Sequence, residues 1–596
     1  MMLNFMSTFS KTRKQYFVSF IFLVLTFLIS FILLQNQKLI FSSALLSIDG
    51  ASKKSVELPF TLKTSGKQMF DFEVIFISKP WISSKIKVIP DDCIDSISIN
   101  EKSFNINNIE NRCDWSYGTE IDLDGYLKDG LNKINIKVLK KDGIGGINIL
   151  GIHDNTFSYV ILKFITMLFL GAIIVFSTHK KLELPLIFIF ISSVLLEFHY
   201  LSYTNYATRT FDLLVPTGHL DYIKMLAYDF SLPNPMKGWE YHQPPLYYII
   251  AAIIYRLFDV IPYIDALVAL QLISLSLFIV FIYYGLKTLS LVIHNKYILL
   301  VSSLLLVFWP SGIIHSIRIG NDILFFTFFS VGIHYIIQWQ INNSKLWLTF
   351  MIASLALITK ANGIILFGVI GILLLLKLYK EHDIKAFLKN TGLGFLFFIL
   401  AFTINFADNI YYALSYGSQD WLVSNVINTI NKNLFVENEL INYLYFDFMT
   451  YLKEPFINPW NDQYGRQYFW NYLFKSALFS EFFFNAKNIT ALVIAALSLP
   501  IFIYIIIGVA MGKKDKVAIV MNLILFLSIT ALLFYRIKIP VACNTDFRYI
   551  YPVIIPMVYF YAEALSYFKQ NRFNSLLFFG FGLPIVFSLL SLNIYI

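Results

Sequence analysis

Ionisable side chains that could act on a reacting group gather in a few short segments of the chain. The longest of these segments runs from Arg209 to His242 and also contains Asp212, His219 and Asp221. The other candidates follow at Arg318, Asp322, Lys360 and Arg548. A carboxylate can take a proton from an attacking hydroxyl group, and arginine and lysine can stabilise negative charge on a leaving oxygen. The residue types therefore suggest general-base chemistry combined with charge compensation.

The elements that must position these residues are membrane spans. Of the 596 residues, 57% are hydrophobic and only 14% are charged, and the mean hydropathy is +0.64. This composition excludes a set of soluble domains. We therefore expect a multi-pass α-helical membrane protein.

The formal net charge of +9 does not indicate a nucleic-acid partner. The basic residues lie in short gaps between apolar runs, where they orient the spans in the membrane. Membrane lipids are therefore expected partners, and nucleic acid is not.

The first apolar run, Tyr16 to Leu34, follows three basic residues and has no small-residue cleavage site. At roughly 20 residues it is long enough to cross a bilayer. We interpret residues 1–35 as a cytoplasmic N-terminus and an anchor helix.

Residues 36–157 alternate between apolar and polar positions, as in Phe72–Phe76 and Ile134–Val138, and turn residues separate the runs. This pattern predicts an extracytoplasmic antiparallel β-sandwich. The stretches Ser98–Lys102, Asp114–Gly118 and Ile121–Ile134 resemble the galactose-binding-like jelly-roll domains. Trp115 and Tyr117 could bind a sugar, but the interpretation as two packed aromatic side chains is favoured.

The three cysteines of the chain are too few for a disulfide scaffold or a cysteine-rich metal cluster. Cys93 and Cys113 both fall in the β-sandwich, on the oxidising side of the membrane, so a disulfide between them is expected. Two free thiols are the alternative.

Residues 158–183 form an expected return helix, and residues 184–596 form a helical core. If all basic clusters face the cytoplasm, the chain has about thirteen spans and an external C-terminus. Pro244 to Tyr255, with about 12 residues, is too short to cross and is interpreted as an interfacial or re-entrant helix. The external loops are then 203–262 and 412–485, and all the candidate residues face outward.

Several motifs on this outer side resemble the GT-C glycosyltransferases, in particular the protein mannosyltransferase and aminoarabinose transferase group. The motifs are Arg209–Asp212, Gly218–Ile223, Leu232–Pro233, Gly238–Tyr248, Arg318–Asp322, Thr359–Lys360, Phe469–Lys475, Glu481–Phe482 and Cys543–Pro552. The resemblance runs from about Leu184 to the end of the chain. It implies a GT-C fold and a sugar donor linked to polyprenyl phosphate.

The resemblance also implies roles for the carboxylates. Asp212 is the candidate catalytic base, which would deprotonate an acceptor hydroxyl so that the sugar is transferred with inversion. The alternative is that Asp212 caps a helix or pairs with Arg209. Family members often have an acidic pair here, whereas Leu213 follows Asp212 in this chain, so Asp221 is the nearest second acid.

The remaining candidates are expected to bind substrate. Arg318, Lys360 and Arg548 would stabilise the departing phosphate, or else contact lipid headgroups, and Asp322 would orient Arg318. The further binding candidates are Arg209, His219, Asp221 and His242. Because the spacing of these histidines with Asp221 matches no standard ligand pattern, no metal site is assigned. No cofactor is required, although a divalent metal would be compatible.

The predicted function is transfer of a sugar from a polyprenyl-phosphate carrier to an extracytoplasmic acceptor, such as a lipid-linked glycan, lipid A or a protein. The alternative is a polysaccharide or glycolipid transport protein, but span interiors contain almost no ionisable residues, which disfavours it. The Ile-, Lys- and Asn-rich usage is typical of an AT-rich bacterium. We therefore expect the inner (plasma) membrane, with the active site on its periplasmic face.

Overall fold

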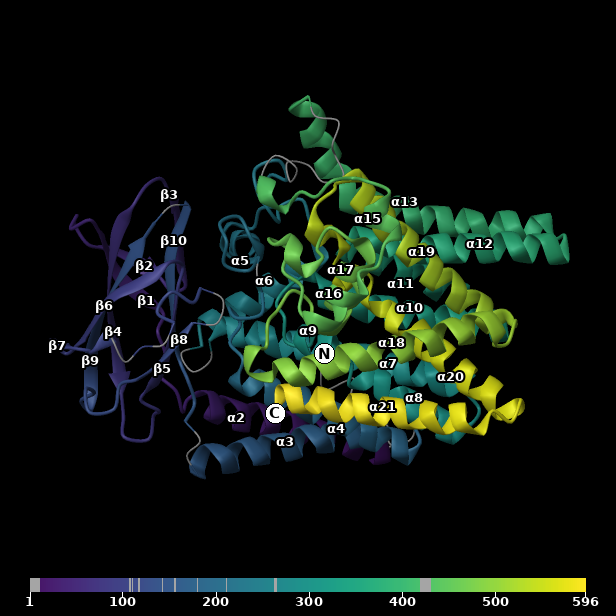
Figure 1. Cartoon of the computed structure of the whole chain (residues 1–596), viewed down its shortest axis with the longest axis horizontal. Coiled ribbons are helices and arrows are strands. Elements are labelled where there is room, and N and C mark those ends of the chain that lie inside the picture. Colours follow the sequence, from purple (N-terminus) through teal and green to yellow (C-terminus); the bar gives the residue numbers. More distant parts are fainter. Residues whose placement is uncertain are drawn as a thin grey trace. The chain divides into compact units, whose positions relative to one another are not determined.

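The chain folds into two compact units. The computed structural model describes residues 11–106, 109, 111–115, 118–141, 143–154, 157–178, 181–210, 212–261, 265–417 and 430–596. The first unit consists of Met1–Thr178, Leu201–Tyr228 and Ala252–Leu270, and the second of His179–Tyr200, Asp229–Ala251 and Gln271–Ile596 (Figure 1). The first unit thus joins the N-terminal domain with parts of the first predicted loop. The predicted division at residues 35, 157 and 183 stays a prediction of membrane topology.

The N-terminal domain is an antiparallel β-sandwich, as predicted. One sheet has the order β2-β1-β4-β9-β6-β7, and the other has the order β3-β10-β5-β8 (Figure 1). The strands are β1 (Ser43–Ile48), β2 (Lys54–Glu57), β3 (Phe60–Thr64), β4 (Gln68–Ser78), β5 (Lys85–Pro90), β6 (Cys93–Ile99), β7 (Lys102–Ser103), β8 (Thr119–Asp122), β9 (Gly130–Lys140) and β10 (Gly143–Gly151).

The core of the sandwich follows the alternation seen in the sequence. Phe70, Phe72 and Val74 of β4 are fully buried, and so are Ile134 and Ile136 of the paired strand β9. Successive side chains of a strand point to opposite faces, so these residues share the inner face of their sheet. The apolar periodicity is therefore the cause of the sandwich.

The predicted disulfide is confirmed. Cys93 at the start of β6 is bonded to Cys113, with a Cα–Cα distance of 4.0 Å across a sequence separation of 20. The bond ties the loop that follows β6 and β7 back to the sheet.

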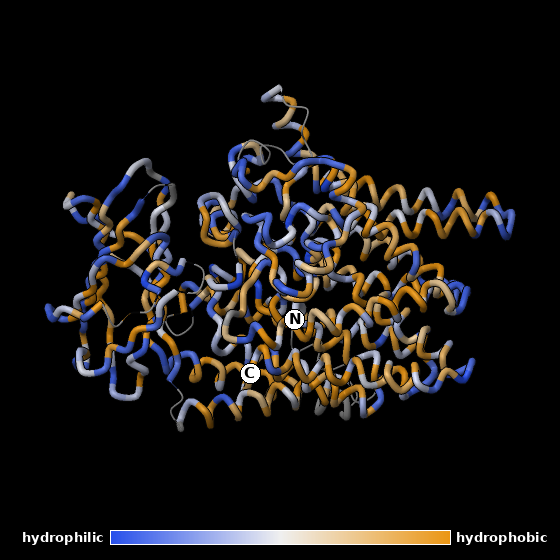
Figure 2. Tube along the Cα trace, in the orientation of Figure 1, coloured by the Kyte–Doolittle hydropathy of each residue, from blue (hydrophilic) through white to orange (hydrophobic). Residues whose placement is uncertain are grey.

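The helices are long and apolar, and nine of those that the structure describes could cross a membrane by length and composition. They are α3 (Phe157–Thr178), α4 (Leu184–Tyr203), α7 (Ala266–Val292), α10 (Asn321–Asn342), α12 (Ile364–Glu381), α13 (Ile384–Ser415), α18 (Asn488–Met511), α19 (Lys516–Lys538) and α21 (Asn574–Tyr595). Hydrophobic segments dominate these helices in Figure 2, and polar segments mark their ends.

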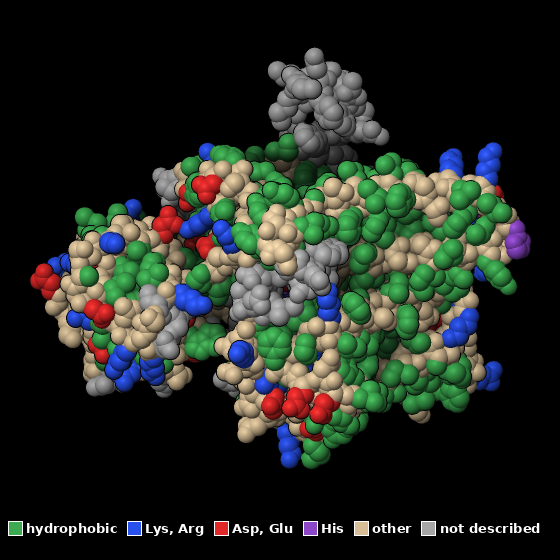
Figure 3. All heavy atoms as spheres, turned by 90° about the horizontal axis from the view of Figure 1, so that it is seen from above, with side chains coloured by type: hydrophobic (Ala, Val, Ile, Leu, Met, Phe, Trp, Pro, Cys, Tyr) green, Lys and Arg blue, Asp and Glu red, His purple; other side chains and the backbone are tan. Residues whose placement is uncertain are grey.

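Three further apolar helices are shorter. They are the part Ser19–Gln35 of α2 (Lys11–Gln35), α8 (Lys296–Val307) and α11 (Leu346–Thr359). They are not among the nine that could cross by length and composition, so the expected number of about thirteen spans stays a prediction, and α20 (Ile554–Gln570) is a further, largely buried helix. Large apolar side chains such as Phe395 and Leu396 of α13 are exposed, and Figure 3 shows hydrophobic side chains over much of the surface. Such exposure is expected for helices that contact lipid. The fold class is a multi-pass helical membrane protein with an N-terminal β-domain.

Short elements occupy the two long loops. The first contains α5 (His219–Lys224), a π-helix (Met225–Asp229) and α6 (Leu246–Asp259). The short helix predicted after Pro244 is confirmed, because α6 has only 14 residues and is below the length of a span. The second loop begins after Ser415 rather than at residue 412, because α13 continues to Ser415, and it contains α15 (Ile441–Leu444), α16 (Phe448–Lys453) and α17 (Phe469–Phe479).

Candidate functional site

Lys360 is held at the end of a membrane helix by an acidic and an aromatic side chain. It follows the last residue of α11, is only 7% exposed, and forms an ion pair with Asp322 in the first turn of α10. Its Nζ atom also lies 4.7 Å from the ring centre of Tyr549. Burial lowers the pKa of Lys360, and Asp322 opposes this effect. The contacts show that the start of α10 and the end of α11 lie at the same end of the second unit.

Arg548 is presented by a tight turn after α19. The buried carboxylate of Asp546 accepts a hydrogen bond from the Arg548 backbone N–H at 3.0 Å, and its other oxygen lies 3.4 Å from Arg548 Nε. The guanidinium also donates a hydrogen bond from Nη2 to the Tyr549 hydroxyl at 3.3 Å. Asp546 thus caps the short helix Phe547–Val553 and orients Arg548 at the same time.

Arg318 belongs to the same charged cluster. It is buried between α9 (Pro310–His315) and α10. Burial raises the pKa of Asp546, and the charges of Arg548 and Arg318 oppose this rise. Burial also lowers the pKa of His315, and the charge of Arg318 adds to that effect, followed by smaller contributions from Arg548 and Lys360. Arg318, Lys360 and Arg548, from distant parts of the sequence, therefore act on one small region, and their role toward a phosphate stays a prediction.

Asp322 has a partner that the sequence did not predict. Its carboxylate forms an ion pair with Lys360. The pairing depends on the packing of α10 against α11, which the local sequence does not specify. That Asp322 also orients Arg318 stays a prediction.

Glu481, together with Asp546, is a site residue that sequence reasoning missed. Its carboxylate is buried after α17 and accepts a hydrogen bond from the hydroxyl of Tyr472. Burial and the neighbouring Asp546 raise the pKa of Glu481 to about 7. The sequence could have indicated both acids, because they lie in the motifs Glu481–Phe482 and Cys543–Pro552 and have apolar neighbours there. The cluster can therefore change its charge near neutral pH.

A hydrogen-bonded chain leads from His242 to this cluster within the second unit. His242 Nδ1 lies 3.0 Å from the Trp239 carbonyl oxygen, and its Nε2 lies 3.3 Å from Gln243 Nε2. The other amide atom of Gln243 accepts a hydrogen bond from Asn321 at 2.9 Å. His242 is therefore a hydrogen-bonded part of the scaffold next to Asp322.

The other first-loop candidates belong to the first unit. The backbone carbonyl of Asp212 accepts a hydrogen bond from the His219 N–H at 2.9 Å, and Gly218 lies so close that a Cβ there would be 2.3 Å from this oxygen. Asp221 accepts a hydrogen bond from the Thr217 N–H at 2.6 Å, which ties its carboxylate to the turn before α5. Arg209 and His219 are buried, and Asp212 is partly buried.

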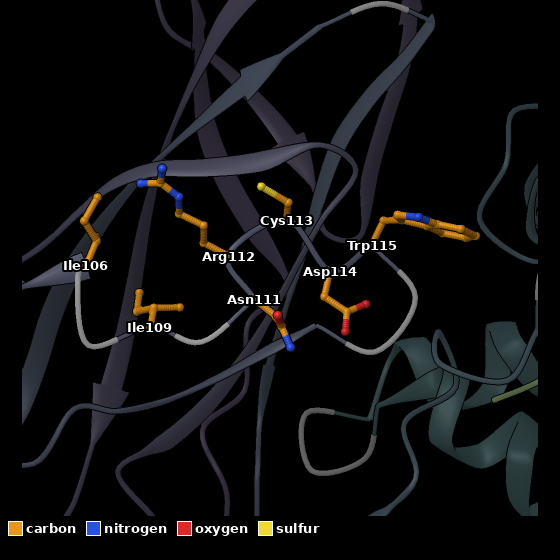
Figure 4. A pocket seen from close by; sticks show the side chains of 7 residues that line it. All are labelled: Ile106, Ile109, Asn111, Arg112, Cys113, Asp114 and Trp115. Carbon is orange, nitrogen blue, oxygen red and sulfur yellow. The ribbon is translucent and has the colours of Figure 1, made fainter. Parts of the chain in front are cut away.

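The interpretation of Trp115 as a packed aromatic residue is wrong, because 56% of its surface is exposed. It lines a hollow of about 750 Å³ next to the disulfide, together with Ile106, Ile109, Asn111, Arg112, Cys113 and Asp114 (Figure 4). In Figure 4 the indole ring points away from Arg112 and Ile109. Tyr117, the second predicted aromatic residue, lies outside the described residues.

No protein-family model and no curated protein sequence matches the chain. Two solved structures are similar to it, both of ArnT from Cupriavidus metallidurans. The structure bound to undecaprenyl phosphate has a TM-score of 0.39 and 10% identity, over 65% of this chain and 62% of that one. The apo structure has a TM-score of 0.40 and 11% identity, over 65% of this chain and 61% of that one. The chain thus matches less than two thirds of the length of these proteins.

Proposed function

We propose that the protein is a GT-C type membrane glycosyltransferase that uses a polyprenyl-phosphate sugar as donor. The observation that carries the proposal is the gathering of Arg318, Lys360 and Arg548 at one end of the membrane helices. All three cations are largely buried, and they come from three separate segments of the chain. The buried carboxylates of Asp322 and Asp546 hold Lys360 and Arg548 in place, and cations that are positioned in this way can bind a phosphate through charge-assisted hydrogen bonds.

A lipid-linked phosphate fits this cluster chemically. When the bond between the sugar and the phosphate breaks, negative charge develops on the leaving oxygen, and pre-positioned cations stabilise that charge. The isoprenoid tail would remain among the apolar helices. Because the donor already carries an activated sugar, the reaction needs no nucleotide at this surface.

Asp212 is the proposed catalytic base. It would take the proton of an acceptor hydroxyl that attacks the anomeric carbon on the face opposite the phosphate, so that the configuration is inverted. The assignment is supported by the residue type and its motif. A direct test is the Asp212→Asn variant in membranes with labelled donor, because an amide cannot accept this proton. Turnover should fall by about 10²–10⁴-fold, and unchanged turnover at normal expression would remove Asp212 from the mechanism.

Asp229→Asn is the matched control for this test. Asp229 is an exposed carboxylate in the same loop and is not a candidate site residue. Its replacement should leave turnover unchanged.

The acceptor is proposed to be an extracytoplasmic glycan, lipid A or protein, and the location is the plasma membrane with the site on its outer face. No divalent metal is required, because the cations of the cluster supply the positive charge. Turnover that persists in EDTA is the expected result.

A further inference from the structure

The β-sandwich contacts the chain segment that carries Asp212. Thr61 of β3 donates a hydrogen bond from its hydroxyl to the backbone carbonyl of Leu214 at 2.9 Å. Leu214 is two residues from Asp212, and both belong to the first compact unit, as Thr61 does. This contact bridges 153 residues of sequence.

A second contact fixes the other end of the segment. Glu57, the last residue of β2, forms an ion pair with Lys224, the last residue of α5. The Lys224 side chain is 28% exposed and that of Glu57 is 75% exposed. A single pair of this kind contributes little to stability by itself, but it adds a second link between the segment and the sandwich, at the end of α5.

A buried polar group ties the start of the same segment to the domain. Asn148 of β10 and Asp265 interact with Tyr206, and the charge of Lys38 acts on Asp265. Burial raises the pKa of Asp265 and lowers that of Lys38. The opposite charge of each group opposes the effect of burial on the other, and so favours its charged form.

A cavity of about 30 Å³ adjoins this buried group. It is lined by Gln35, Lys38, Leu39, Ile40, Phe41, Ile149, Leu150, Gly151, Asn205 and Asp265. At Gly151 the strand passes so close to Leu39 that an added Cβ would lie 2.1 Å from the Leu39 carbonyl oxygen. The segment that follows α2 is therefore in tight backbone contact with β10 at this point.

We infer that the β-sandwich positions the catalytic loop, and that Thr61 and Glu57 are positioning residues for Asp212. The sandwich holds residues 206–224 at three points: near Tyr206, at Leu214 and at Lys224. The role of the loop in catalysis rests on the proposed function, whereas the restraint of the loop rests on the contacts alone. A base must be held close to its productive geometry, and small displacements cost much of the rate.

The restraint can be measured by hydrogen–deuterium exchange on the full chain in nanodiscs. The double variant Thr61→Val and Glu57→Lys removes the hydroxyl donor and reverses one charge. The amides of His219 and Leu220, which donate to the carbonyls of Asp212 and Leu213, should then exchange about 10-fold faster or more. Unchanged exchange in residues 206–224 would overturn the inference.

Exchanging the charges of Glu57 and Lys224 should restore the contact between β2 and α5. Glu57→Lys alone and Lys224→Glu alone should each speed exchange of α5, and the two together should restore slow exchange because the ion pair re-forms with opposite polarity. Glu120→Lys is the matched control, since it breaks the Lys87–Glu120 pair (3.1 Å) between β5 and β8 and should leave residues 206–224 unaffected. Failure of the swap to restore exchange would also contradict the inference.

Kinetics separate this role from the proposed function. With Thr61→Val and Glu57→Lys together, kcat should fall about 10-fold while KM for the donor is unchanged. Faster loop exchange with an unchanged kcat would overturn the positioning role. If the wild-type chain shows no transfer at all, the proposed function fails, and the exchange result still decides whether the sandwich restrains the loop.

Discussion

The ammonium group of Lys360 forms an ion pair with the carboxylate of Asp322, which lies 38 residues earlier in the chain. Both groups are largely buried, and the ring of Tyr549 covers the ammonium group. This pair joins the ends of two membrane helices and sets the position of one of the three cations in the proposed phosphate site.

Removing one partner of this pair should be costly. Lys360→Met leaves a buried carboxylate without its cation and should lower the free energy of unfolding by about 3–5 kcal/mol. The double variant Asp322→Asn and Lys360→Met should recover most of this loss, because the buried charge is gone, but should not recover transfer. Thermal unfolding in detergent, followed by an activity assay, tests both statements. A single Lys360→Met variant as stable as the wild type would contradict the role of the pair.

Arg548 should be needed for the chemical step. Arg548→Lys keeps the charge but loses the planar donors that contact Asp546 and Tyr549. We expect transfer to fall about 10²–10³-fold, as when a donor to a developing oxyanion is removed. Arg572→Lys, at an exposed position after α20, is the control and should transfer normally. Equal activity of the two variants would exclude Arg548 from the site.

Donor binding should depend on pH through Glu481. Its pKa is raised to about 7, so the carboxyl group is protonated below this pH and becomes negative above it, close to Arg548 and Arg318. The affinity for an anionic donor should therefore fall several-fold between pH 6 and pH 8. Glu481→Gln should remove this dependence, and a pH profile of KM that is the same in both proteins would contradict the assignment.

Glu481 should also make the free energy of unfolding depend on pH. A salt-bridged acid stabilises the fold more as the pH rises, whereas Glu481 should stabilise it less. The pKa of Glu481 in the folded state is higher than the ordinary value of 4.5, so the folded protein binds this proton more tightly than the unfolded chain does. The free energy of unfolding should therefore fall as the pH rises from about 4.5 to 7. At pH 8, Glu481→Gln should therefore be more stable than the wild type, by up to about 3 kcal/mol. At pH 5 the difference should be much smaller, which unfolding measured at both pH values can check.

The disulfide should stabilise the β-sandwich. Cys93→Ser opens a loop closed across 20 residues and should cost about 3 kcal/mol. Reduction of the wild type should have the same effect on its unfolding temperature, and Cys543→Ser, at the one cysteine outside the disulfide, should have little effect. A Cys93→Ser variant that unfolds like the wild type would show that the bond does not limit stability.

Local patterns in the sequence predicted much of the fold. The alternation in β4 and β9 and the apolar length of the spans are visible in the sequence because burial of one face, or exposure to lipid, dictates each residue type. The disulfide followed from the expected oxidising compartment. The short helix α6 followed from its length between Pro245 and the charged residues near its end.

The site was predicted less completely. The gathering of Arg318, Lys360 and Arg548 could be inferred because all three fall at helix ends on one side. The partner of Asp322 could not, because it depends on which helix packs beside α10. Glu481 was missed because its altered pKa arises from burial and from Asp546, 65 positions away in the sequence. The contact between Thr61 and Leu214 likewise depends on tertiary structure alone.

The central claim is tested most directly by incubating the purified full-length protein in nanodiscs with a radiolabelled polyprenyl-phosphate sugar and an extracytoplasmic glycolipid acceptor. The account predicts release of free polyprenyl phosphate together with labelled acceptor by the wild type, and a loss of at least about 10²-fold in both products with Arg548→Lys. The account would be contradicted if the wild type released no polyprenyl phosphate, or if the wild type and Arg548→Lys released equal amounts.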